Sequence, residues 1–219
     1  MIYTFFAFLI IVAYLLGSIP FGLVIAKTHG KDLRTIGSGN IGATNVARAL
    51  GRKWAYICFI LDVLKGLIPM LAAMFITKMA SPAQASAQSF FLALWLAVGC
   101  AAILGHIFPI YLKFKGGKGV ATSFGVALGL WPYYTICALV AVAIWVLVVL
   151  LWRYISLASI TASIAFPLVL ALAIALSPGW DLADLWLLLI VSAAIPLIVI
   201  IRHQQNIKRL LTGTENKLH

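Results

Sequence analysis

Residues 119–152 read GVATSFGVALGLWPYYTICALVAVAIWVLVVLLW, a stretch that contains no charged side chain. A helix that crosses a membrane needs about 20 apolar residues, so this stretch is long for one such helix and short for two. Pro132 is its natural break, because proline lacks the N–H that a helix interior requires. Divided there, the stretch predicts one short or re-entrant helix after residue 118 and one full-length span that ends near residue 152.

Five further apolar stretches are each long enough to cross a membrane: residues 2–26, 54–77, 89–112, 155–176 and 183–201. The chain of 219 residues is 64% hydrophobic and only 10% charged, whereas a soluble domain carries about a quarter charged residues. These features predict an all-α integral membrane protein with about seven transmembrane helices in a single domain, residues 1–219. The apolar N-terminal segment has no basic residue before it, and we expect a retained span rather than a signal peptide.

The basic residues indicate how these spans are oriented. All sixteen lysines and arginines except Lys65 and Lys78 fall in four segments that seven spans place on one side of the membrane: residues 27–53, 113–119, 153–156 and 202–219. Cytoplasmic loops are enriched in lysine and arginine, so we expect the N-terminus outside and the C-terminus in the cytoplasm. A single span over residues 119–152 would instead force Arg153 and the basic tail outside. The net charge of +11 then suits anionic membrane lipid, and nucleic acid is not an expected partner.

The first basic segment contains the motif GSGNIGATN at residues 37–45. The motif matches the glycine spacing of a dinucleotide fingerprint, but that fingerprint follows a β-strand, and here a membrane span precedes it. Its glycines still let backbone N–H groups approach a phosphate closely. The candidate anion-binding side chains are Ser38, Asn40, Thr44, Asn45 and Arg48, with Arg52 one turn later. The alternative is a solvated turn between two helices.

The second basic segment contains KGGKG at residues 115–119, followed by VATS at residues 120–123. Its spacing is not that of a nucleotide-binding Walker loop. A helix that begins directly after such a loop presents unpaired N–H groups and a partial positive charge, which favour an anion. We therefore expect a phosphate site at Gly116, Gly117, Lys118 and Gly119, the alternative being a basic loop that only sets the topology.

Two shorter segments complete the polar face. A tight turn contains Ser156, and the tail reads RHQQNIKR at residues 202–209, where His203 and Asn206 share a helix face. The alternative for the tail is a basic stop-transfer segment. Asp62 and Lys65 lie within the second span, one turn apart, either as an internal pair or as a support for the basic loops. The three cysteines are isolated from one another, and neither a disulfide framework nor a metal site is expected.

These motifs resemble one family. The segments GSGNIGATN at residues 37–45, GHIFP at residues 105–109 with FKGGKGVAT at residues 114–122, and HQQNIKR at residues 203–209 before GTE at residues 213–215 are similar to signature segments of bacterial membrane glycerol-3-phosphate acyltransferases that use acyl phosphate. The resemblance is ordered along nearly the whole chain. One departure is the pair of glutamines after His203, where many members have arginine in the first position, so one positive charge is missing.

The resemblance implies transfer of a fatty acyl group from long-chain acyl phosphate to the 1-hydroxyl of glycerol 3-phosphate. The products would be lysophosphatidic acid and inorganic phosphate, in the first step of phospholipid synthesis. It also implies a multi-pass protein of the bacterial inner membrane with its active site on the cytoplasmic side. No cofactor, metal or coenzyme A and no obligate protein partner are expected, and association with an enzyme that produces acyl phosphate stays open.

Within this chemistry, the residues expected to act in catalysis are Ser38, Lys118, His203 and Asn206. Lys118 and Arg48 would hold the anionic groups, and Ser38, Thr44, Ser156 and Asn206 would be neutral donors. The general base is either His203, whose side chain titrates near neutral pH, or the substrate phosphate, whose second pKa is about 6. The rival function is an anion transporter or lipid flippase, but such proteins place their sites near the membrane midplane between repeats, and no convincing repeat is found here. A membrane scaffold without chemistry would not explain why glycine, asparagine, serine and arginine concentrate in the loops.

Overall fold

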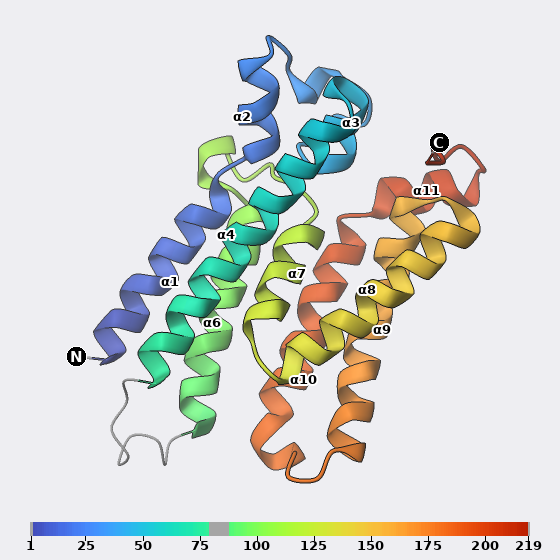
Figure 1. The fold of residues 1–219 in the computed structure, drawn as a ribbon. Coiled ribbons are helices and arrows are strands. Elements are labelled where there is room, and N and C mark those ends of the chain that lie inside the picture. Colours follow the sequence, from blue (N-terminus) through green and yellow to red (C-terminus); the bar gives the residue numbers. More distant parts are fainter. Residues whose placement is uncertain (1, 79–87, 219) are drawn as a thin grey trace. The chain divides into compact units, whose positions relative to one another are not determined.

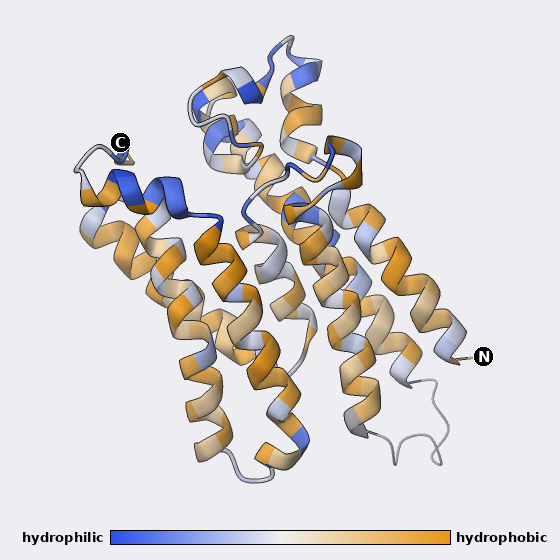
Figure 2. Ribbon diagram, turned by 180° about the vertical axis from the view of Figure 1, so that it is seen from behind, coloured by the Kyte–Doolittle hydropathy of each residue, from blue (hydrophilic) through white to orange (hydrophobic). Residues whose placement is uncertain are grey.

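The computed structural model describes residues 2–78 and 88–218, and every regular element in these ranges is helical. The helices fall into two units, Met1–Gly129 and Leu130–His219, which are called unit 1 and unit 2 below. Each unit pairs long helices with short helices and loops at one end (Figure 1). In both units, the hydrophilic residues gather mainly in these short segments, and the long helices are largely hydrophobic (Figure 2).

Unit 1 contains α1 (Ile2–Ser18), α2 (Phe21–Thr28), the 3-10 helix η1 (Leu33–Thr35), α3 (Ala43–Leu50), α4 (Arg52–Lys78), α6 (Gln88–Ile107), the 3-10 helix η2 (Ile110–Leu112) and α7 (Val120–Gly129). Helix α1 packs along α6, and α4 packs along α7. A separate core joins α2, η1 and α3, where Leu23, Leu33 and Val46 are almost completely buried. Leu112 of η2 packs against the same core, so the first two polar segments are joined within one unit.

The first apolar stretch, expected as one span over residues 2–26, consists of two helices. Helices α1 and α2 are bent by 40° at the Ile19–Pro20 junction. Proline at position 20 lacks a backbone N–H and disfavours helical geometry in the residue before it, which favours a break in the helix at this point. The break carries α2 and the loop after it away from the axis of α1.

Helix α7 has 10 residues and is about 15 Å long at 1.5 Å per residue. This agrees with the short helix predicted after residue 118, since about 20 residues are needed to cross a membrane. Glycines allow α7 to lie very close to α4. A Cβ atom added to Gly66 would be 2.4 Å from the Thr122 carbonyl oxygen, and one added to Gly125 would be 2.0 Å from that of Val63.

Unit 2 contains α8 (Tyr133–Trp152), α9 (Ile155–Leu176), α10 (Leu182–Ile201) and α11 (Gln204–Leu211). Helix α9 packs against both α8 and α10. The Tyr134 hydroxyl donates a hydrogen bond of 2.6 Å to the Leu188 carbonyl, which links α8 to α10. Arg153 turns the chain from α8 into α9 with a left-handed backbone, φ 60°. This tight turn and the amphipathic α11 lie at the same end of unit 2 (Figure 1).

Within the described residues, five helices are long and apolar enough to cross a membrane, and the bent pair α1 and α2 would make a sixth. The five are Arg52–Lys78, Phe90–Leu112, Tyr133–Trp152, Ile155–Leu176 and Leu182–Ile201. The predicted all-helical membrane fold is therefore confirmed. The count of seven spans, their orientation and the single domain stay predictions.

Candidate functional site

Asn45 organises the first polar loop of unit 1. Its side chain is buried, with 1% of the residue exposed. The amide nitrogen donates to three carbonyl oxygens, those of Leu33, Ile36 and Asn40, at 2.8–3.0 Å. Its Oδ1 accepts the Ser38 N–H at 3.1 Å. Asn45 was predicted to contact an anion, but in the structure its amide holds the loop together.

The turn around Asn45 leaves other polar groups on the surface. Gly37 and Gly39 have φ of +57° and +69°, a left-handed geometry that favours glycine. Asn40 accepts the Gly42 N–H through Oδ1 at 2.9 Å, just before α3 begins. Ser38, Thr44 and Arg48 are exposed, and the Arg48 side chain passes beside Gly37. The loop therefore presents two hydroxyls and a guanidinium on one small surface, as an anion site requires.

The charge of this loop is almost entirely positive. Asp32 is its single carboxylate, and Arg34 binds both carboxylate oxygens at 2.6–3.1 Å. The Arg34 side chain and backbone hydrogen bonds lower the pKa of Asp32 to about 2. Asp32 is thus ionised at neutral pH and is already neutralised by Arg34, so it does not offset the charge of Arg48.

The glycine loop of unit 1, residues 115–119, folds back over the end of α6. Gly116 donates its N–H to the Ile107 carbonyl at 3.2 Å, and Gly117 donates to the His106 carbonyl at 3.1 Å. A Cβ atom on Gly117 would lie 2.1 Å from the Nε2 atom of the His106 ring. The structure differs here from the expected cradle, because these two N–H groups bond to the protein itself and the glycines permit close packing.

Beyond these glycines, the loop leads into α7 at Gly119, whose φ is +91°. The first N–H groups of a helix have no partner within the helix and carry a partial positive charge. Lys118 stands one residue before this turn, partly buried. The cationic side chain and the start of α7 are therefore the parts of the loop best suited to an anion.

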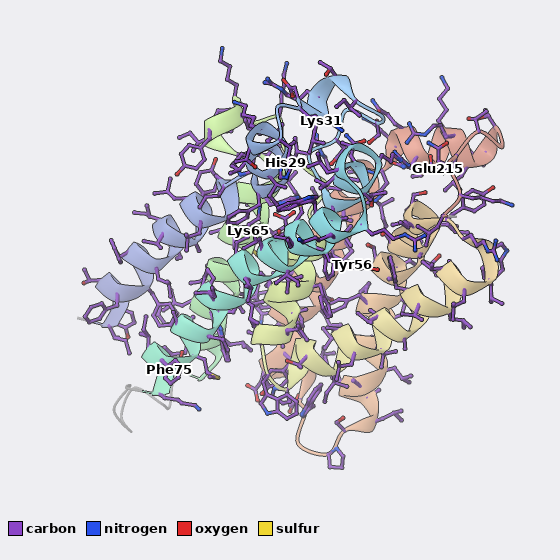
Figure 3. The ribbon with its side chains drawn as sticks, turned by 45° about the horizontal axis from the view of Figure 1, so that its top comes forward. His29, Lys31, Tyr56, Lys65, Phe75 and Glu215 are labelled. Carbon is purple, nitrogen blue, oxygen red and sulfur yellow. The ribbon has the colours of Figure 1, made fainter. Side chains whose placement is uncertain are left out.

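The polar cluster of unit 2 is centred on Glu215. Its carboxylate accepts hydrogen bonds from the Ser156 hydroxyl at 2.7 Å, the Asn206 amide at 2.6 Å and the Arg209 guanidinium at 2.6 Å. Glu215 lies beside α11, as Figure 3 shows, and its side chain is 6% exposed. Burial alone would raise the pKa of Glu215, but the hydrogen bonds from Ser156, Arg209 and Asn206 lower it below its usual value. The ionised carboxylate ties the tail to the start of α9.

His203 lies at the junction of α10 and α11 and is buried, with 2% exposed. Its Nδ1 atom is 2.8 Å from the Val199 carbonyl oxygen. A carbonyl can only accept, so Nδ1 carries the hydrogen and Nε2 is the acceptor nitrogen of the neutral ring. His203 and Asn206 do occupy one face of this turn, as their spacing predicted.

The charges within the second apolar stretch form an internal pair, one of the two alternatives that the sequence left open. Lys65 Nζ lies 2.8 Å from Asp62 Oδ1, and both side chains are at least 95% buried. Among residues 2–78 and 88–218, no three His, Cys, Asp or Glu side chains are grouped so that they could hold a metal ion.

Comparison with known proteins decides the family. The sequence profile described as glycerol-3-phosphate acyltransferase matches residues 7–213. The chain belongs to the glycerol-3-phosphate acyltransferase family.

Relatives in this family match over nearly their whole length. The chain is 47% identical over 209 residues to the glycerol-3-phosphate acyltransferase of Geotalea daltonii, with 95% of each chain covered. It is 45% identical over 212 residues to that of Aquifex aeolicus, covering 96% of this chain and 97% of the relative. The resemblance seen in the motifs is thereby confirmed.

Two crystal structures of PlsY (YgiH), an integral membrane glycerol 3-phosphate acyltransferase, are similar to this chain. The glycerol 3-phosphate form has a TM-score of 0.81 and 44% identity, covering 98% of this chain and 96% of that one. The lysophosphatidic acid form has a TM-score of 0.78 and 43% identity, covering 98% and 95%. This member of the glycerol-3-phosphate acyltransferase family is thus a multi-pass membrane protein.

In this acyltransferase-family chain, the predicted site residues divide between the units. Unit 1 contains Ser38, Asn40, Thr44, Asn45 and Arg48 on one loop and Gly116, Gly117, Lys118 and Gly119 on the other, and unit 2 contains Ser156, His203 and Asn206. The prediction missed the central position of Glu215. The sequence did contain a signal for this position, because Glu215 is the one acidic side chain in the basic segment 202–219. A carboxylate that becomes buried in such a segment needs hydrogen-bond donors around it.

Proposed function

We propose that the protein transfers a fatty acyl group from acyl phosphate to the 1-hydroxyl of glycerol 3-phosphate. The observation that carries this proposal is 44% identity, over 98% of the chain, to a PlsY structure in a glycerol 3-phosphate form. A second PlsY structure, in a lysophosphatidic acid form, supports lysophosphatidic acid as the product. We place the reaction at the cytoplasmic face of a bacterial inner membrane, as the first step of phospholipid synthesis, because the predicted site lies in loops rich in lysine and arginine and such loops are typically cytoplasmic.

The reaction needs no covalent enzyme intermediate, because acyl phosphate is a mixed anhydride with a good leaving group. The hydroxyl oxygen forms a new ester bond to the acyl carbon, and the bond from that carbon to the phosphate oxygen breaks. Phosphate leaves with the electron pair. The protein's task is to hold two anionic substrates together and align them, and alignment alone is worth about 7–11 kcal/mol.

The positive charge of unit 1 suits this task. Lys118 and Arg48 hold the phosphate groups, and Ser38 and Thr44 add neutral donors from the same exposed loop as Arg48. In unit 2, the Ser156 hydroxyl and the Asn206 amide each donate a hydrogen bond to Glu215, so that carboxylate fixes the orientation of both side chains. Preorganised donors and cations stabilise the oxyanion that develops on the acyl group, and the loops of unit 1 provide both.

The proton of the attacking hydroxyl goes to the phosphate of glycerol 3-phosphate, with His203 as a hydrogen-bonding positioner. The fixed Nδ1 donor to Val199 holds the ring so that Nε2 can accept a hydrogen bond. We predict that His203→Ala lowers kcat by about a hundredfold or less, as expected when a positioning contact is lost. Near-complete loss that added imidazole restores would instead identify His203 as the base.

The function is tested with purified protein in lipid vesicles and radiolabelled glycerol 3-phosphate. We expect labelled lysophosphatidic acid and an equal amount of inorganic phosphate with acyl phosphate, and neither with acyl coenzyme A. Lys118→Met and the exposed control Lys113→Met are compared, and only the former should lose activity. Product formation from acyl coenzyme A alone would contradict the proposed donor. Uptake of label into vesicles without a lipid product would indicate a transporter.

A further inference from the structure

A buried charged cluster lies in unit 1 directly behind the glycine loop. Asp62 and Lys65 on α4 form an ion pair of 2.8 Å, and their side chains are 5% and 3% exposed. Charged residues within a membrane span are costly and are retained where they support a function. The pair makes specific contacts with two other parts of unit 1, and these contacts suggest what it supports.

Lys65 reaches the break in the first apolar stretch. Lys65 lies on α4 (Figure 3), and its Nζ atom donates a hydrogen bond of 2.9 Å to the carbonyl of Ile19, at the junction of α1 and α2. Its ammonium group also lies 5.6 Å from the centre of the Phe21 ring. The Ile19 carbonyl also accepts the Phe21 N–H at 3.1 Å. Lys65 therefore links α4 to the start of α2.

Asp62 reaches toward the end of α6. Its Oδ1 atom lies 3.7 Å from Nδ1 of His106, which is 6% exposed. The other side of the His106 ring lies against Gly117, where a Cβ atom would be 2.1 Å from Nε2. The carbonyls of His106 and Ile107 also accept the N–H groups of Gly117 and Gly116. His106 is thus in contact with the charged pair on one side and with the glycine loop on the other.

We propose that Asp62 is a positioning residue for substrate binding: with Lys65 it fixes the His106 ring, and that ring fixes the glycine loop that carries Lys118. The inference rests on the proposed function, and it assigns Lys118 to the phosphate of glycerol 3-phosphate. Asp62 itself touches no substrate. Its loss should therefore impair binding of glycerol 3-phosphate more than the chemical step.

The test compares Asp62→Asn with the wild type in steady-state assays, varying each substrate in turn. A displaced loop should raise KM for glycerol 3-phosphate about tenfold, with kcat and the KM for acyl phosphate changed much less, because small misplacements of a binding group are costly. Asp62→Asn with His106→Gln should be no worse than His106→Gln alone, since both act through one contact. Thr77→Val, which removes a hydroxyl near the other end of α4, is the matched control and should leave kcat and both KM values unchanged.

If Asp62→Asn does not fold, the neutral pair Asp62→Asn with Lys65→Gln replaces it, because removing both charges leaves neither unpaired. Melting in detergent checks the fold of every variant. A folded variant with unchanged KM for glycerol 3-phosphate would overturn the positioning role. A fall in kcat as large as the rise in both KM values would overturn it too. An inactive wild type would instead refute the proposed function, which keeps the two failures distinct.

Discussion

Glu215 shows how one side chain can organise a polar end of unit 2. Three donors from α9 and α11 converge on its carboxylate, and the tail beyond it is held by the Leu218 N–H, which donates to the Arg153 carbonyl at 2.7 Å. Charge-assisted hydrogen bonds are stronger than neutral ones, so the ionised form of Glu215 is the form that stabilises this end.

The stability of this cluster should depend on pH in a defined window. The folded pKa of Glu215 lies below its usual 4.5, so its contribution is fully present above that pH and is lost as pH falls through the lowered value. We expect the thermal midpoint in detergent to fall with pH in this range for the wild type and to fall less for Glu215→Gln. The matched control is Asp32→Asn, whose exposed ion pair contributes little. A wild-type profile that matched Glu215→Gln would contradict this assignment.

The loop at residues 37–45 shows that the sequence predicts residue types in a site but not the direction of their side chains. The motif at residues 37–45 predicted a loop whose side chains bind an anion, and in the structure Asn45 is buried whereas Ser38, Thr44 and Arg48 are exposed. Residue type and spacing do not determine side-chain direction in a non-periodic loop. That direction depends on the left-handed turns at Gly37 and Gly39 and on the carbonyls that they turn toward Asn45.

At the scale of elements, glycine contacts set the distance between the helices of unit 1. Gly125 faces backbone atoms of α4, namely the Val63 carbonyl and the Leu67 nitrogen, whereas Gly99 faces the side chains of Val126 and Met70. A backbone contact cannot be relieved by changing a side chain, whereas a side-chain contact can be relieved by substituting a smaller residue. The two glycines therefore respond differently to the same substitution.

We predict that Gly125→Ala lowers the thermal midpoint and that Val63→Ala does not restore it, because the contact is with the main chain. Gly99→Ala should also lower the midpoint, and adding Val126→Ala should restore part of the loss. Overpacking of this kind costs about 1–3 kcal/mol. Melting of the four variants in one detergent checks the prediction, and rescue of Gly125→Ala by Val63→Ala would show that the helices are not in backbone contact.

The sequence predicted one of the two helix breaks at proline and not the other. Pro132 and the length of the run from residue 119 to 152 indicated the short α7, because a chemical break lies between two apolar segments. The break at Pro20 was missed, because apolar residues continue on both sides of it and an average hydropathy does not register a bend. At this bend the Ile19 carbonyl accepts hydrogen bonds from the Phe21 N–H and from Lys65 of α4, and local hydropathy does not reveal that second contact.

For the molecule as a whole, the orientation in the membrane is the main untested prediction. Single cysteines at Ser38, Lys113 and Gln205, all exposed positions, should react with an impermeant thiol reagent only from the cytoplasmic side, in a background without the native cysteines. A cysteine at Asp181 should react only from the opposite side. Membrane vesicles of known and opposite sidedness provide the measurement. Labelling of Ser38→Cys and Gln205→Cys from different sides would contradict seven spans.

The length of α7 has a consequence for how two unlike substrates can meet. A helix of about 15 Å reaches only halfway through a hydrocarbon layer about 30 Å thick, so at least one of its ends must lie well below the headgroups. Irregular backbone is tolerated at that depth only where protein shields it. The loop before α7 meets this condition, because Gly116 and Gly117 donate their N–H groups to the carbonyls of Ile107 and His106. If the recessed end is the one that carries Lys118, the proposed reaction brings glycerol 3-phosphate down toward the level of the acyl chains, and the proposed acyl phosphate donor need not leave the bilayer to react.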